Sequence, residues 1–298
     1  MEKFLPLLIS LLAVLIMVAF FTLFERKFLG ILQTRSGPSK VGFWGLLQPF
    51  SDMLKLVTKT TPSPGKGLPA GYLLGPFGML ILSGLVFAFL PFKFSKENEF
   101  SAVTVLMVLS VSSFPLIISG WFSRSKYSVL GSLRSVSQHI SFEIPLSTSI
   151  ISIVILNQTS SIHEILIHSG VWVSFFCPTL PVLMTLSLSA EASRLPFDLP
   201  ESESELVSGY SIEYGGAMFT IIFLAEACSL LLLSGLFSSL LSGSISPPLS
   251  LSLLFLAVWA RGVLPRVRYD LMMEVCWVEL VPMALSTLWL CAMALCTS

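Results

Sequence analysis

Charge is scarce in this sequence: Asp, Glu, Lys and Arg together supply 11% of its 298 residues, whereas a soluble chain carries about 25%. This shortage excludes an ordinary soluble globular enzyme. The apolar N-terminal run ends in Phe24-Glu25-Arg26-Lys27 instead of a small-residue cleavage site, and no Arg-rich presequence precedes it. We therefore expect a chain made inside an organelle or in a bacterium.

Metal-ligating and phosphate-binding patterns are also missing. The five cysteines include no Cys-x-x-Cys pair and are expected to be small buried apolar residues. Among the three histidines, His163 and His168 are one residue too far apart for the zinc-protease helix motif. Gly65, Gly67 and Gly71 lack the strand–helix context of a phosphate loop. We expect no metal, flavin, haem, iron–sulfur cluster or nucleotide on this chain, and no nucleic-acid partner.

Apolar residues instead dominate, at 54% with a mean hydropathy of +0.87. A membrane span requires roughly 20 predominantly apolar residues, and Pro247-Pro248 divides the long run after residue 214. The sequence predicts an all-α, polytopic membrane protein with one domain, 1–298, and eight transmembrane helices. The expected spans are residues 4–24, 72–92, 100–123, 139–160, 168–190, 213–238, 249–264 and 275–296.

The basic residues lie on one side of this topology. Fourteen Lys and Arg fall in or beside the loops that join spans 1–2, 3–4, 5–6 and 7–8, against Lys3, Lys93 and Lys96 on the other side. The positive-inside rule places those four loops in the matrix or cytoplasm. Both termini are then expected on the opposite side.

An amphipathic helix is predicted at 44–59, after the first span. Its apolar residues recur every three or four positions, with Asp52, Lys55 and Lys59 off that face. The apolar residues are Leu46, Leu47, Phe50, Leu54 and Val57. This segment is too short and too charged to span, which favours a helix lying at the membrane interface. The alternative is an ordinary surface helix under a loop.

The basic loops suit docking of a soluble partner. The cations expected to take part are Arg124, Lys126, Arg134, Arg194, Arg266 and Arg268. Their segments are "GWFSRSKYSVLGSLRSVSQHISFE" and "WARGVLPRVRYDLMME", together with the loop after span 5. The alternative is that these cations only anchor helices at the lipid headgroups.

Acidic residues are concentrated in a loop on the same side, residues 191–213. It holds Asp198, Glu201, Glu203 and Glu205, while Glu143, Glu191 and Glu213 should lie near the positive-side boundary. Glu226 is 13 residues past Glu213, roughly 20 Å along a helix, which places it near mid-bilayer.

An intramembrane carboxylate indicates a functional site. Carboxylates that interact in a low dielectric can store and pass protons, so we expect the series to form a proton path. The alternatives are static ion pairs with Arg194, Arg124 or Arg134 and, for the loop glutamates, a solvated surface.

These motifs together resemble the NADH dehydrogenase subunit 1 family, the membrane subunits of respiratory complex I that form the quinone chamber. The resemblance covers the whole chain. It rests on "ERKFLG" (25–30), "QTRSGPSKVGFWGLLQPFSDMLKL" (33–56), "GWFSRSKYSVLGSLRSVSQHISFE" (120–143), "AEASRLPFDLPESESELVSGYSIEY" (190–214), "AEA" (225–227) and "RGVLPRVRYDLMM" (261–273).

The resemblance implies a core membrane subunit of proton-pumping NADH:ubiquinone oxidoreductase in the mitochondrial inner membrane, not catalytic alone. Ubiquinone would be its substrate, admitted beside span 1, the amphipathic helix and span 6. The residues implied at this opening and chamber are Glu25, Arg26, Gln33, Arg35, Trp44, Phe50, Asp52 and Phe219. The carboxylates would couple quinone reduction to proton translocation.

The implied partners are the iron–sulfur and quinone-binding subunits of the peripheral arm, small and antiporter-like membrane subunits, and phospholipids, cardiolipin among them. Three positions depart from the family pattern, namely Ser36, Ser202 and Ala227. The alternatives are the equivalent subunit of a photosynthetic complex I or membrane-bound hydrogenase, a bacterial plasma-membrane location, and a self-contained proton-coupled transporter. The transporter would require an internal repeat, and none is evident.

Overall fold

The computed structural model describes residues 4–60, 69–90, 99–168, 177–199, 209–242 and 247–297. Within these ranges every regular element is helical and no strand occurs, which confirms the all-α prediction. The long helices are α1 (Phe4–Leu32), α3 (Pro69–Phe89), α6 (Lys126–Asn157), α11 (Gly216–Ser242), α12 (Pro247–Val263) and α14 (Val281–Thr297). The shorter ones are α2 (Gln48–Thr58), α4 (Ser101–Val111), α5 (Ser113–Phe122), α7 (Ile162–His168), α9 (Thr179–Glu191) and α13 (Tyr269–Glu274).

Five helical stretches of the described residues are long and apolar enough to cross a membrane. They are Ala70–Phe87, Ser101–Phe122, Lys126–Asn157, Gly216–Ser242 and Tyr269–Cys296. The chain is therefore a multi-pass membrane protein. The number of eight crossings stays a prediction, because α12 is shorter and part of the expected span 168–190 lies outside the described residues.

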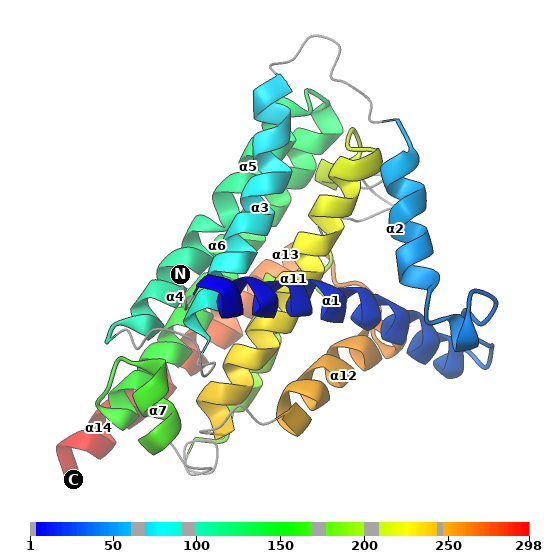
Figure 1. The fold of residues 1–298 in the computed structure, drawn as a ribbon. Coiled ribbons are helices and arrows are strands. Elements are labelled where there is room, and N and C mark those ends of the chain that lie inside the picture. Colours follow the sequence, from blue (N-terminus) through cyan, green and yellow to red (C-terminus); the bar gives the residue numbers. More distant parts are fainter. Residues whose placement is uncertain are drawn as a thin grey trace.

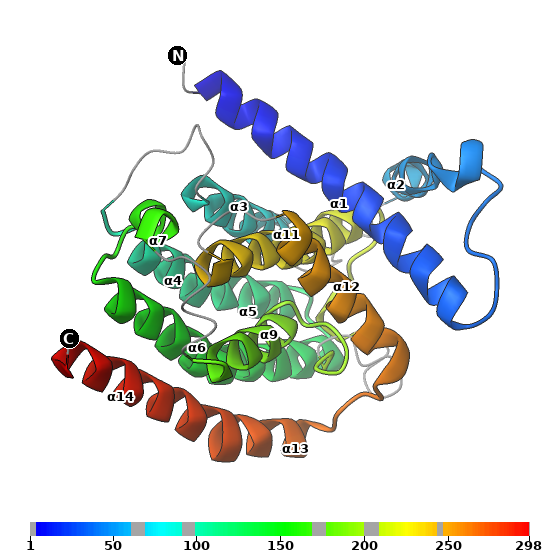
Figure 2. The ribbon, with the colours of Figure 1, turned by 90° about the horizontal axis from the view of Figure 1, so that it is seen from below.

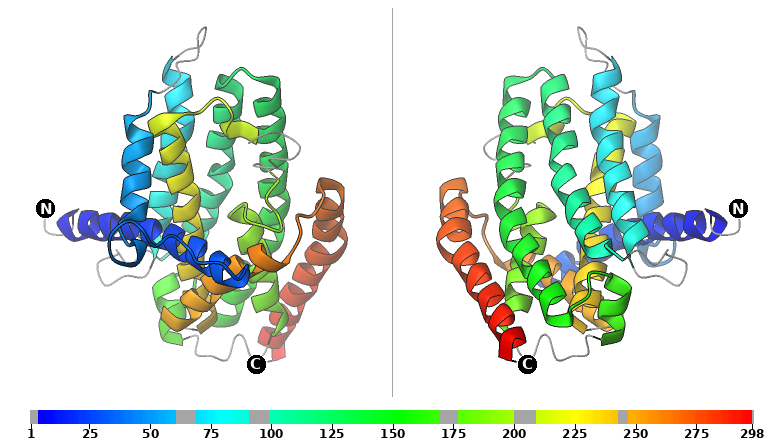
Figure 3. Two further views of the ribbon diagram at one scale, coloured as in Figure 1. Left: turned by 90° about the vertical axis from the view of Figure 1, so that its right-hand side faces the viewer. Right: turned by 90° about the vertical axis from the view of Figure 1, so that its left-hand side faces the viewer.

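The helices α3, α5, α6 and α11 run alongside one another, and α1 crosses them steeply (Figure 1; Figure 3). Helix α11 is central: it packs against α1, α2, α3, α9 and α12. Seen from below, α1 and α14 lie on opposite flanks of the bundle (Figure 2). Helix α14 contacts α6 and α9.

Helix α1 continues eight residues beyond the expected span, because nothing between Phe24 and Leu32 breaks a helix. Within these added turns, Glu25 and Arg26 form ion pairs with residues of other segments, as described below. The helix stops just before Thr34, which has a φ of 55°, and the following Gly37-Pro38 is unfavourable to further helix.

Helix α6 also begins earlier than the expected span 139–160. The segment 126–143, interpreted above as part of a loop, is helical from Lys126. The Ser125 side chain caps this helix by accepting a hydrogen bond from the Ser128 backbone amide at 3.2 Å. The extra turns bring Gln138 into the protein interior.

The expected span 100–123 is divided at Ser112 into α4 and α5. Pro115 lacks an amide hydrogen and crowds the preceding turn, which accounts for the interruption. Ser112 therefore stands where the helix is irregular, and its hydroxyl is directed toward Glu191, 3.5 Å away.

A second proline, Pro145, lies inside α6 and leaves the Ser141 carbonyl without its helical donor. The thiol of Cys276 donates to that carbonyl oxygen at 3.2 Å. Cys276 lies in a π-helical segment, Val275–Leu280, that joins α13 to α14. Freed backbone groups inside a membrane need such a partner, so this contact ties the last span to α6.

Candidate functional site

A cavity that holds a small cluster of ionisable groups within a mostly apolar wall, called the polar cavity below, lies between α3, the junction of α4 and α5, α6, the end of α9, and α11. It offers about 80 Å³ to the centres of water molecules, enough for on the order of five waters. Apolar side chains of α3 and α11 form much of its wall. Its ionisable lining residues are His139, Glu191, Tyr210 and Glu226.

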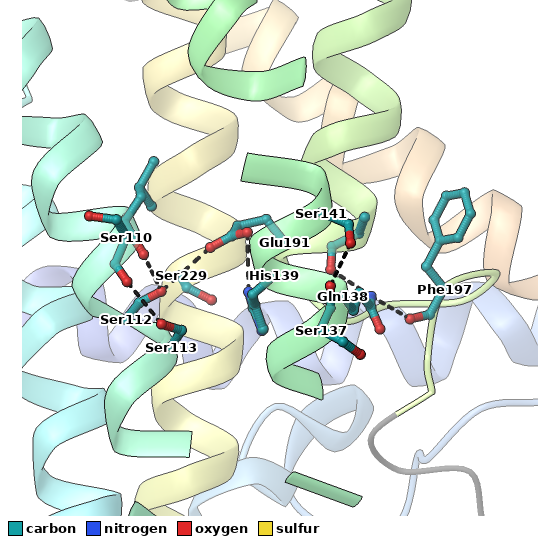
Figure 4. Close-up of polar contacts among 12 residues, drawn as sticks. Ser110, Ser112, Ser113, Ser137, Gln138, His139, Ser141, Glu191, Phe197 and Ser229 are labelled. Carbon is teal, nitrogen blue, oxygen red and sulfur yellow. Dashed lines mark hydrogen bonds and ion pairs between the residues drawn. The ribbon is translucent and has the colours of Figure 1, made fainter. Parts of the chain in front are cut away.

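His139 of α6 and Glu191 at the end of α9 form the centre of this site. Their Nδ1 and Oε2 atoms are 3.1 Å apart, and both side chains are largely buried. The Ser112 hydroxyl approaches the other Glu191 oxygen from the opposite direction, so the carboxylate lies between two helices (Figure 4). A carboxylate and an imidazole in contact can exchange a proton.

Glu226 of α11 lines the same cavity. It accepts a hydrogen bond from the Tyr210 hydroxyl. Tyr210 belongs to the short 3-10 turn Gly209–Ser211, near the end of the 191–213 loop. The structure therefore brings Glu191 and Glu226 to one cavity, although they lie on different helices.

The other predicted acids lie elsewhere. Glu143 is one turn beyond His139 on α6 and does not line the cavity. Glu213 is exposed. Asp198 pairs with Arg266 at 3.1 Å. Three more, Glu201, Glu203 and Glu205, lie outside the described residues, as does Ser202.

A separate apolar groove lies between α1, α2 and α11. Of the residues predicted at the quinone opening, Arg26, Asp52 and Phe219 line it, together with apolar residues of the three helices. Arg26 and Asp52 form an ion pair at 2.5 Å. The groove offers about 190 Å³ to water-sized molecules, more than the polar cavity.

The remaining residues predicted at that opening lie outside the groove. Trp44 is 80% exposed, and the Arg35 Nε donates to the Gln33 side chain at 2.9 Å on the surface. Phe50 packs edge-on against Phe20 at 6.1 Å. Helix α2 keeps an exposed apolar face, but its position at a membrane interface stays a prediction.

Glu25 is buried instead of facing the groove. Its Oε1 lies 2.5 Å from the Arg261 Nη1 and 3.4 Å from the Arg194 Nη1. Arg194 thus forms its ion pair with Glu25 of α1. The cations Arg124, Lys126 and Arg268 are exposed, and Arg134 is partly buried.

Four contributors to the site escaped sequence reasoning: His139, Tyr210, Gln138 and Arg261. Gln138 is fully buried, and its amide donates to the carbonyls of Ala190 and Phe197 at 2.8 and 2.7 Å. It thereby holds the segment after α9 against α6 (Figure 4). One signal for His139 was available, since it precedes Glu143 by four residues and so shares its helix face.

No group of three or more His, Cys, Asp or Glu within the described residues is arranged to hold a metal ion. The site is therefore built from single carboxylates, an imidazole and hydroxyls. These groups bind and release protons, and they can order water between them.

The fold and the site define a class: a multi-pass helical membrane protein with a carboxylate-lined cavity beside an apolar groove. The chain belongs to the NADH dehydrogenase family, whose model matches residues 5–292. The resemblance deduced from the motifs is thereby confirmed.

Curated relatives agree with this assignment. The chain is 41% identical over 275 residues to NADH-ubiquinone oxidoreductase chain 1 of Artemia franciscana, covering 91% of this chain and 92% of that protein. It is 40% identical over 298 residues to the protein of the same name from Anopheles gambiae, covering 97% and 95%. The Mycosarcoma maydis protein of that name is 37% identical over 310 residues, covering 95% and 93%.

Proposed function

We propose that this chain is a core membrane subunit of a proton-translocating NADH:ubiquinone oxidoreductase and that it couples quinone reduction to proton movement. The observation that carries the proposal is the cavity that brings Glu191, His139 and Glu226 together between helices. The names of the relatives support the assignment of this chain to that enzyme complex. We expect the chain not to be catalytic by itself.

The groove between α1, α2 and α11 supports a path for ubiquinone from the bilayer. Its walls are apolar, which suits an isoprenoid chain, and the Arg26–Asp52 pair marks its polar end. Phe219 offers an aromatic surface to a quinone ring. Exposed apolar residues on α2, such as Leu54 and Val57, continue this surface toward lipid.

The cavity supports the coupling step. Reduction of a quinone takes up protons, and a change in charge nearby alters the proton occupancy of interacting carboxylates. Glu191 pairs with His139 at 3.1 Å, so a proton reaching this pair can be shared between the carboxylate and the imidazole. Glu226 would pass it on toward the antiporter-like subunits.

The exposed cations Arg124, Lys126 and Arg268 would dock the peripheral arm, with the iron–sulfur and quinone-binding subunits it carries. Arg134, Arg194 and Arg266 would lie beside these exposed cations and contribute positive charge to the same docking face. The location would be the mitochondrial inner membrane, with eight crossings, basic loops in the matrix and both termini in the intermembrane space. Cardiolipin and other phospholipids would contact the outer helices.

The variant Glu226→Gln tests the coupling role. It keeps the shape of the side chain but removes the titrating group, so quinone-dependent turnover should fall at least about tenfold. NADH oxidation with an artificial acceptor should be unchanged, because it does not use the membrane arm. The matched control is Glu164→Gln, which changes an exposed glutamate of α7.

Normal turnover and proton pumping in an assembled Glu226→Gln complex would exclude the coupling role. The complex itself is tested by mild solubilisation and a native gel. Co-migration with flavin and iron–sulfur subunits in an NADH-oxidising band is expected. Migration of the chain without any redox protein would instead favour a self-contained proton-coupled transporter.

A further inference from the structure

The turn Gly209–Ser211, near the end of the 191–213 loop, is held tightly against α6. A Cβ atom on Gly131 would lie 2.8 Å from the Gly209 Cα, so only glycine allows the two backbones to approach this closely. One turn earlier on α6, the Ser128 hydroxyl donates to the Tyr210 carbonyl at 3.3 Å. Gly209 itself has a φ of 56°, in the left-handed region that favours glycine. The backbone of Tyr210 is therefore positioned by α6.

The side chain of Tyr210 extends from this turn to α11. It is 1% exposed, and its hydroxyl donates to the Glu226 carboxylate. A hydroxyl that donates to a carboxylate stabilises the ionised form. The contact thus joins the end of the 191–213 loop to the deepest acid of the cavity.

Other ionisable groups also act on Glu226 from the surrounding elements. They are His139 of α6 and Arg194 and Asp198 of the segment after α9, with Glu191 lining the same cavity. Among these, Tyr210 is the group whose hydrogen bond reaches the Glu226 carboxylate directly and whose backbone belongs to the turn ending the acidic loop.

We infer that Tyr210 is the positioning residue through which the turn Gly209–Ser211 sets the proton occupancy of Glu226. With the turn seated on α6, the hydroxyl reaches Glu226 and favours its ionised form. Displacement of the turn withdraws the hydroxyl, and the carboxylate then binds a proton more readily. The inference rests on the proposed function, since it assumes that Glu226 takes part in coupling.

The test compares two tyrosines that lie four residues apart. In Tyr210→Phe the ring remains but the donor to Glu226 is lost. The matched control is Tyr214→Phe, because the Tyr214 hydroxyl donates to the Ser119 carbonyl at 3.1 Å and its ring stacks on Tyr72 at 4.4 Å. Burial raises the pKa of Tyr214, with a smaller contribution from Tyr72, so its hydroxyl stays neutral throughout the assay.

The measurement is the pH profile of quinone-dependent turnover in the assembled complex. For Tyr210→Phe the acidic limb should move to higher pH by about one unit, the size expected for a lost hydrogen bond to a charged group. The control should keep the parental profile. In the Glu226→Gln background, Tyr210→Phe should produce no further shift.

An unshifted profile in Tyr210→Phe, or a shift that persists with Glu226→Gln, would overturn the inference. Such a result leaves the coupling proposal standing if Glu226→Gln alone still lowers turnover. Conversely, full turnover in Glu226→Gln refutes the coupling proposal itself.

Discussion

Glu25 forms ion pairs with two arginines, and we predict that replacing it by glutamine strongly lowers the stability of the complex. Glu25 of α1 contacts Arg194, after α9, and Arg261 of α12 through the same oxygen. Three segments far apart in the sequence therefore meet at one carboxylate. The variant Glu25→Gln keeps the size of the side chain but leaves both cations without its negative charge.

The expected magnitude follows from burial. The Glu25 side chain is 8% exposed and that of Arg194 13%, whereas that of Arg261 is 38% exposed. Breaking a buried pair by removing one partner costs about 3 to 5 kcal/mol, and partial exposure of Arg261 favours the lower end. We therefore expect a loss of about 3 kcal/mol.

The control is the other ion pair of α1. Arg26 and Asp52 are 53% and 32% exposed, and solvent screening limits such a pair to about 1 kcal/mol or less. Asp52→Asn should therefore have little effect on stability. Both variants remove one negative charge, but Glu25 is buried between two arginines, whereas Asp52 is partly exposed and pairs with one.

The assay is thermal dissociation of the solubilised complex, followed on native gels by the release of this chain. Glu25→Gln should lower the midpoint by roughly 6 °C, and Asp52→Asn by about 2 °C or less. Equal shifts for the two variants would refute the reasoning, because the difference in burial would then carry no energetic weight.

Two further predictions concern the segment after α9 and the groove. Gln138→Leu should destabilise the complex by about 2 to 4 kcal/mol, because the carbonyls of Ala190 and Phe197 each lose a buried donor. The control is Ser147→Ala, which removes a hydrogen bond within α6. Equal thermal dissociation midpoints for the two variants would contradict this prediction. Phe219→Ala should raise the KM for ubiquinone without changing the artificial-acceptor reaction. The control, Phe114→Ala on the exposed face of α5, should leave the KM for ubiquinone unchanged. An unchanged KM in Phe219→Ala would exclude Phe219 from the quinone path.

Much of the fold could be predicted because hydropathy is a local property. Runs such as 72–92 and 213–238 contain enough apolar residues to demand helices in a bilayer, whatever they pack against. The ends of the helices were harder to predict from the sequence. Helix α6 starts at Lys126 because Ser125 caps it, and its polar first turns resembled a loop.

The candidate site could be predicted in part. Glu226 and Glu191 stood out because a carboxylate in an apolar run needs a reason, and the structure places both at one cavity. Arg26, Asp52 and Phe219 were proposed through the family resemblance, and they line one groove. His139 and Tyr210 gave no comparable signal, since a lone imidazole or phenol is unremarkable in sequence.

The sequence by itself determined that this chain crosses a membrane and that it belongs to its family, while the gathering of its acids and bases on one side stays a prediction. These properties depend on composition and order alone. Only the tertiary structure decided the partners: Glu25 meets Arg261 across 236 residues, and Glu191 meets His139 across the contact of α9 with α6. Such pairs depend on the packing of whole helices, because a contact between distant residues exists only once every segment between them has been placed.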